Sequence, residues 1–128
     1  LVGGGGIDKF IVVGQNDSIT DLGQGGNDVL QVQSNAVANA TLAASWVASS
    51  ASFNSGVVDL KTNGYSVDLT AINSETGNGY KITNTGIGTQ IKGSKFNDTL
   101  ESEGKLIIFA HHKEVIQTLE KQLSNLNT

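Results

Sequence analysis

The chain contains no cysteine, proline, methionine or arginine among its 128 residues. Without thiols it has neither disulfides nor cysteine-based zinc sites, so any cross-linking has to come from packing or from hard cations such as calcium. No methionine and no charged, apolar leader precedes Leu1, and we therefore expect a piece of a longer polypeptide. This length predicts one main domain with a modest core.

The formal net charge is −4, and acidic residues dominate the amino-terminal part. The charged residues of the first thirty positions are Asp8, Asp17, Asp21, Asp28 and a single lysine, Lys9. Acidic side chains repel phosphate backbones, and the missing arginines remove the usual bidentate contacts, so we expect no nucleic-acid partner. The longest apolar run, Leu106–Ala110, is too short to cross a bilayer, so we expect no membrane insertion.

A nine-residue pattern of the form Gly-Gly-x-Gly-x-Asp-x-apolar-x occurs in four stretches. Residues 3–11 match it at every specified position, and residues 23–31 lack only the second glycine. Residues 12–20 retain the aspartate and the apolar residue, and residues 93–101 retain these and the first glycine. On these four stretches the chain resembles the RTX (repeats-in-toxin) family of hemolysin-type calcium-binding proteins.

Calcium takes six to eight oxygen ligands, and glycine loops can turn several backbone carbonyls toward one ion while an aspartate supplies charge. In an RTX roll, as the resemblance implies, ions lie between loops one full turn of eighteen residues apart, and Asp8 and Asp28 are nearly that far apart. The predicted Ca²⁺ ligands are Gly3, Gly4, Gly6, Asp8, Gly23, Gly25, Gly26 and Asp28, with Asp17 and Asp98 as further candidates. The alternative is that these segments are simple turns.

Apolar residues at a nine-residue spacing give an independent sign of a solenoid, because each half-turn of such a roll should place one apolar residue inward. The three ladders are Phe10 and Ile19; Leu60 and Leu69; and Ile82, Ile91 and Leu100. We therefore predict an all-β fold, a parallel β-roll or β-solenoid. The dipeptide Asn63-Gly64 between two alternating runs favours a hairpin instead, so a β-sandwich of hairpins is the alternative fold.

The segment 34–55 fits strand and helix periodicities alike, and its Ser, Thr, Asn and Val content favours extended structure. We expect Trp46 to fill the core, and the alternative is that it stacks on a sugar in an adhesin. From position 105 the sequence changes character, so we divide the chain into a calcium-binding β-rich segment, 1–104, and a short carboxy-terminal appendage, 105–128, with a strand and an amphipathic helix. This tail is locally similar to a strand and helix of Swi/Snf-type translocases, but the chain has no complete phosphate loop.

No residue pattern indicates an enzyme. The two histidines, His111 and His112, are adjacent and so point in different directions on a helix, and no nucleophile elbow is present. We expect a calcium-binding structural segment of a large secreted or S-layer-like bacterial protein that folds with calcium, assembles with copies of itself and lies outside the cell. The resemblance implies type I secretion. The alternatives are an adhesin or ligand-binding module and the noncatalytic RTX part of a secreted hydrolase or toxin.

Overall fold

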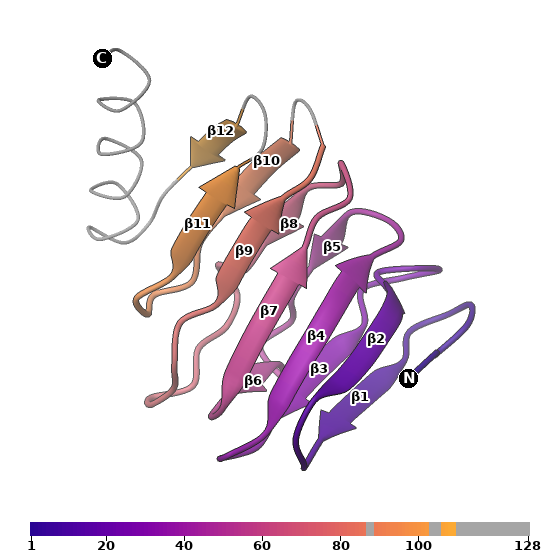
Figure 1. The fold of residues 1–128 in the computed structure, drawn as a ribbon, viewed down its shortest axis with the longest axis vertical. Coiled ribbons are helices and arrows are strands. Elements are labelled where there is room, and N and C mark those ends of the chain that lie inside the picture. Colours follow the sequence, from indigo (N-terminus) through magenta and orange to yellow (C-terminus); the bar gives the residue numbers. More distant parts are fainter. Residues whose placement is uncertain (87–88, 103–105, 110–128) are drawn as a thin grey trace.

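The computed structural model describes residues 1–86 and 89–102, and the backbone of 106–109. These residues form an all-β solenoid of about five turns, in which every strand pairing is parallel (Figure 1). The prediction of a parallel β-roll or β-solenoid is therefore confirmed, and the alternative sandwich of hairpins is wrong. The helix expected after position 110 lies outside the described residues.

Three parallel sheets make up the walls of the solenoid. Sheet A contains, in spatial order, β1 (Lys9–Val12), β3 (Val29–Val32) and β6 (Phe53–Asn54). Sheet B contains β11 (Thr99–Ser102), β9 (Lys81–Asn84), β7 (Val57–Lys61), β4 (Val37–Leu42) and β2 (Asp17–Leu22). Sheet C contains β12 (Leu106–Phe109), β10 (Thr89–Lys92), β8 (Val67–Asp68) and β5 (Trp46–Val47).

The turns of the solenoid differ in length. Lys9 pairs with Val29, whereas Val67 pairs with Ile91 and Thr89 pairs with Leu106. A regular eighteen-residue turn, as the RTX resemblance implies, occurs between β9 and β11, where Lys81 pairs with Thr99. From β3 to β8 the chain visits sheets A, B and C in succession, but this does not set the length of the turn, because the turn from β8 to β10 visits only sheets C and B.

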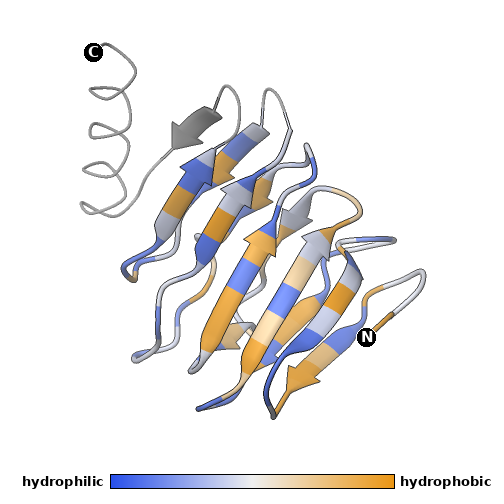
Figure 2. Ribbon diagram, viewed as in Figure 1, coloured by the Kyte–Doolittle hydropathy of each residue, from blue (hydrophilic) through white to orange (hydrophobic). Residues whose placement is uncertain are grey.

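The core is one column of apolar side chains enclosed by the three sheets, and alternating hydropathy along the strands is visible in Figure 2. All seven ladder residues predicted from the nine-residue spacing are buried. Successive members lie on different walls, because nine residues carry the chain from one sheet to the next. A side chain buried every second residue on short strands is sufficient to fill so narrow a core.

Trp46 is fully buried at the start of β5, and its indole Nε1 donates a hydrogen bond to the Asp28 carbonyl oxygen at 2.8 Å. The expectation that it fills the core is confirmed, and the alternative of a sugar-stacking Trp46 is wrong. The segment 34–55 is extended, as predicted, in β4, β5 and β6.

The Asn63-Gly64 turn has positive φ at both residues, 51° and 86°. These are the dihedral signs of a hairpin turn, but here the turn joins β7 in sheet B to β8 in sheet C. The Asn63-Gly64 dipeptide therefore predicted the turn correctly, but the predicted hairpin pairing of the two flanking strands is wrong. Each strand pairs instead with strands of the neighbouring turns of the solenoid, which we call coils.

Replacement of the buried Leu60 by alanine should lower the free energy of unfolding by about 2–5 kcal/mol, because it opens a cavity in the column. Val57→Ala on the same strand is the matched control, since Val57 is 54% exposed and its truncation should cost less than about 0.5 kcal/mol. Urea unfolding followed by circular dichroism measures both, and equal costs would contradict the inward assignment of Leu60.

Candidate functional site

The two best-matching glycine loops lie in adjacent coils at the amino-terminal end of the solenoid. One contains Gly3–Gly6 and leads through Asp8 into β1; the other contains Gly23–Gly26 and leads through Asp28 into β3. The pairing of β1 with β3 and the hydrogen bond from the Val29 N–H to the Asp8 carbonyl, 2.8 Å, stack the two loops. The prediction that these two repeats are neighbours is confirmed.

Glycine is required where the loops touch. Gly25 has φ of 83°, and a Cβ at this position would overlap the Gly6 nitrogen. Positive φ recurs in both loops, at Gly4, Gly6, Gly23 and Gly25. The close approach of one backbone to the next therefore explains much of the glycine pattern without any ligand.

Asp28 is completely buried, and both of its carboxylate oxygens accept backbone hydrogen bonds. Oδ1 accepts from the Asp8 N–H at 2.9 Å, and Oδ2 accepts from the Gly23 N–H at 2.8 Å. The side chain thus closes its own loop and binds the start of the strand in the preceding coil. Two charge-assisted hydrogen bonds offset part of the cost of burying a carboxylate.

Asp98 repeats this arrangement near the other end of the described solenoid. Its Oδ1 accepts from the Tyr80 N–H at 2.8 Å, eighteen residues earlier, and its Oδ2 accepts from the Ser94 N–H at 2.7 Å. The Ser94 hydroxyl donates to Oδ1 as well, at 2.7 Å. The two aspartates therefore share one structural role: each carboxylate links its own loop to the previous coil.

Tyr80 is the residue that meets Asp98 from the preceding coil. Burial raises the pKa of the Tyr80 phenol well above its usual range, and the negative charge of Asp98 raises this pKa further. The phenol therefore stays protonated at neutral pH. Its hydroxyl is buried and makes no hydrogen bond, so Tyr80 packs as a core residue.

A third carboxylate of this kind, Asp21, was not predicted from the sequence. It accepts hydrogen bonds from the Gly3 N–H at 3.1 Å and the Gly4 N–H at 2.8 Å, seventeen to eighteen residues earlier, and is 7% exposed. The signal that could have identified it is strand alternation, because Asp21 has the same parity as the buried Ile19. An acidic residue at an inward position requires a partner.

Asp8 differs from Asp28 and Asp98 because one of its carboxylate oxygens has no partner. Asp8 Oδ2 is buried without a hydrogen bond, and a Cβ on Gly3 would overlap this carboxylate. An open hollow lies beside it, lined by Leu1–Gly3 and by Asp8–Ile11. Among the predicted ligands, Asp8 is the one with a buried carboxylate oxygen that accepts no hydrogen bond, and this oxygen lies close to the backbone of Gly3.

The structure does not bring all predicted ligands together. It groups Asp8 and Asp28 with the predicted glycines of the two loops, whereas Asp17 begins β2 in sheet B and Asp98 lies several coils away. No group of three or more acidic or histidine side chains placed to hold a metal occurs in the described ranges. The histidines His111 and His112 lie outside those ranges.

Comparisons with protein-family models, characterised proteins and solved structures found no match for this chain. The RTX resemblance therefore depends on the nonapeptide positions alone. Across the described residues no helix has the length and hydropathy needed to cross a membrane.

Asp28→Ala should lower the free energy of unfolding by about 2–4 kcal/mol in chelator-containing buffer, because it leaves the Asp8 and Gly23 N–H groups unpaired. Asp17→Ala is the control: its side chain makes no such bonds, and its loss should cost less than about 1 kcal/mol. Denaturant titration compares the two variants, and an Asp28→Ala cost no larger than the control would show that the buried carboxylate does not hold the coils.

Proposed function

We propose that this chain is a calcium-binding structural segment of a large secreted or cell-surface bacterial protein, in which calcium strengthens the amino-terminal coils. The observation that carries the proposal is Asp8 Oδ2, a buried anionic oxygen without a partner, beside two stacked glycine loops. A buried carboxylate oxygen that lacks a donor favours a cation as its partner.

Asp8 is the side chain that fits a cation best. Asp28 fits less well as a direct ligand, because its two oxygens already accept N–H donors that an ion would displace. A calcium ion here would be held by the Asp8 carboxylate together with backbone carbonyls of the Gly3–Gly6 and Gly23–Gly26 loops, since calcium accepts both kinds of oxygen. The roles of Asp17 and Asp98 as further calcium ligands stay predictions.

Such a site carries little negative charge, so its affinity should be modest. Calcium affinity rises with the number of charged ligands, and extracellular modules bind with dissociation constants of about 10⁻⁴–10⁻³ M. An ion held mainly by carbonyls is therefore suited to surroundings rich in calcium, which supports the proposed location outside the cell.

The shape of the molecule suits a load-bearing role. Each coil adds a layer to a continuous core, and the first coil carries exposed apolar side chains at Leu1, Val2, Ile7, Ile11 and Val13. The described part of sheet A ends at β1, whose outer edge is open to another strand. Both features support assembly with copies of the same chain or with similar segments.

Calcium should raise the thermal stability of the chain, with a gain of about 2.7 kcal/mol at a calcium concentration one hundred times the dissociation constant. Asp8→Asn should abolish this gain, because the amide removes the charge and keeps the shape. Calorimetry or circular dichroism melts in calcium and in chelator measure it.

Glu75→Gln provides the control, since it removes one carboxylate charge from the exposed loop between β8 and β9, which belongs to a later coil than the glycine loops. This variant should respond to calcium as the unmodified chain does. Melts that are indifferent to calcium and chelator, or a calcium response that survives Asp8→Asn, would contradict the proposal.

A further inference from the structure

The outward face of sheet B carries two ranks of polar side chains that run along the solenoid axis. The strand register places Ser18, Asn39, Asp59, Lys81 and Thr99 side by side in the first rank. The second rank holds Thr41, Lys61, Thr83 and Glu101. Neighbours within a rank are about 4.8 Å apart, and the ranks are about 6.6 Å apart, because alternate residues of each strand face outward.

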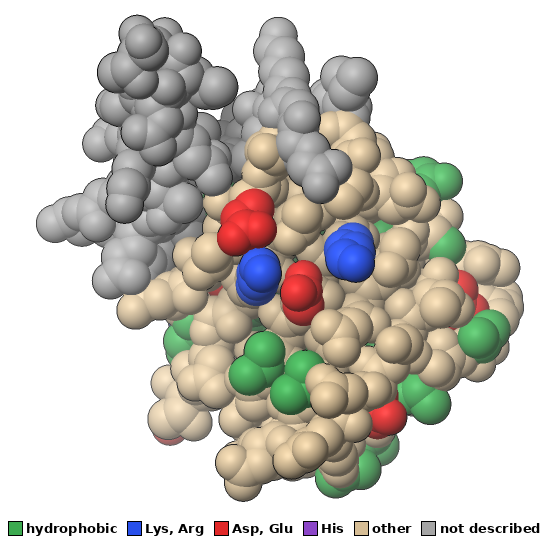
Figure 3. Space-filling view, viewed as in Figure 1, with side chains coloured by type: hydrophobic (Ala, Val, Ile, Leu, Met, Phe, Trp, Pro, Cys, Tyr) green, Lys and Arg blue, Asp and Glu red, His purple; other side chains and the backbone are tan. Residues whose placement is uncertain are grey.

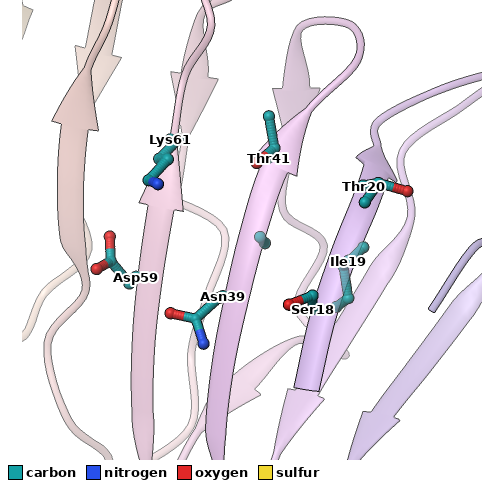
Figure 4. Close-up of a pocket in the computed structure, with 8 residues that line it drawn as sticks. Ser18, Ile19, Thr20, Asn39, Thr41, Asp59 and Lys61 are labelled. Carbon is teal, nitrogen blue, oxygen red and sulfur yellow. The ribbon is translucent and has the colours of Figure 1, made fainter. Parts of the chain in front are cut away.

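A hollow of about 200 Å³ crosses β2, β4 and β7 on this face. Its polar lining consists of Ser18, Thr20, Asn39, Thr41, Asp59 and Lys61, whose side chains stand in two rows in Figure 4. The hollow exists because β2 and β4 present short side chains, whereas β7 presents the longer lysine and its neighbouring carboxylate.

Two charged groups at the edge of the hollow have unused capacity. Asp59 Oδ2 lies 4.0 Å from Lys81 Nζ, but Asp59 Oδ1 is shielded from solvent and accepts no hydrogen bond. Lys61 forms no ion pair with the other described residues and is exposed. Asp59 Oδ2 and the Lys61 ammonium are therefore the charged groups at this edge that a ligand can reach.

The charges on the outward face of sheet B do not favour a highly charged polymer as the ligand. The charges of Asp59 and Lys61 cancel within the hollow, and Figure 3 shows acidic and basic side chains next to one another near the middle of this face. The other lining groups are hydroxyls and an amide, each able to donate and to accept. A ligand that matches them has many hydroxyls, no net charge and a repeat along one axis.

We propose that this hollow binds a neutral glycan lying across β2, β4 and β7, along the solenoid axis. Sugar hydroxyls would donate to Asp59 Oδ2, accept from Lys61 Nζ, and exchange hydrogen bonds with the threonine and asparagine side chains. None of the described residues that line the hollow is aromatic, so the affinity comes from hydrogen bonds and is expected to be millimolar. This inference does not depend on calcium at the glycine loops.

The test is a titration of the full, ¹⁵N-labelled chain followed by backbone amide shifts. The probes are neutral hexasaccharides of glucose, of mannose and of N-acetylglucosamine, with a sulfated hexasaccharide as the charged comparison. At least one neutral probe should give saturable shifts on β2, β4 and β7, and the sulfated probe should not bind more tightly. Running the titration in chelator separates this result from the calcium proposal.

The variant Thr20→Val/Thr41→Val removes two hydroxyls from the hollow and keeps the strand-forming shape. It should weaken binding by about fivefold or more. Thr99→Val, the same change on β11 away from the hollow, should leave the affinity unchanged, and thermal melts confirm that both variants fold. The proposal is overturned if no neutral probe gives saturable shifts, if the sulfated probe binds preferentially, or if both variants bind as the unmodified chain does.

Discussion

Every coil of this protein depends on backbone groups finding partners in the next coil. In the sheets these partners are the carbonyls of neighbouring parallel strands, but where the chain turns, strand pairing stops and N–H groups lose their acceptors. Asp28, Asp98 and Asp21 supply acceptors at these points, each from a carboxylate that is nearly or fully buried. Strand pairing joins successive coils within the sheets. The aspartate carboxylates join them at the turns between the strands.

This role changes the meaning of the nonapeptide pattern. An aspartate before a short strand can hold a cation, or it can accept the N–H groups of its own loop and of the previous coil. Asp28 and Asp98 do the second: each accepts one N–H from its own loop and one from the previous coil, and Asp98 also accepts the Ser94 hydroxyl. Asp8 has a buried oxygen without a donor, and this oxygen is therefore the proposed calcium ligand. One sequence motif thus accommodates two different ways of compensating a negative charge.

The solenoid fold was predictable because apolar core residues recur at a nine-residue spacing. Ile82, Ile91 and Leu100 lie nine residues apart and enter the core from alternating walls, so the spacing alone indicated a solenoid. The varying length of the turns was not predictable, because insertions between strands leave no periodic trace. The partners of Asp28 were also hidden, since both are backbone N–H groups, one of them twenty residues distant. The hollow on sheet B could not be predicted either, because it depends on which strands are neighbours and on their register, and the sequence alone gives neither.

The most direct test of the account is the exchange rate of individual amide hydrogens in chelator. The N–H groups of Asp8, Gly23, Tyr80 and Ser94 lie outside the strands, yet each donates to a buried carboxylate. If the aspartates hold successive coils together, these four amides exchange as slowly as those of the neighbouring strands. Exchange as fast as that of the exposed Gly14 would contradict the account, because it would show that the carboxylates do not close the turns.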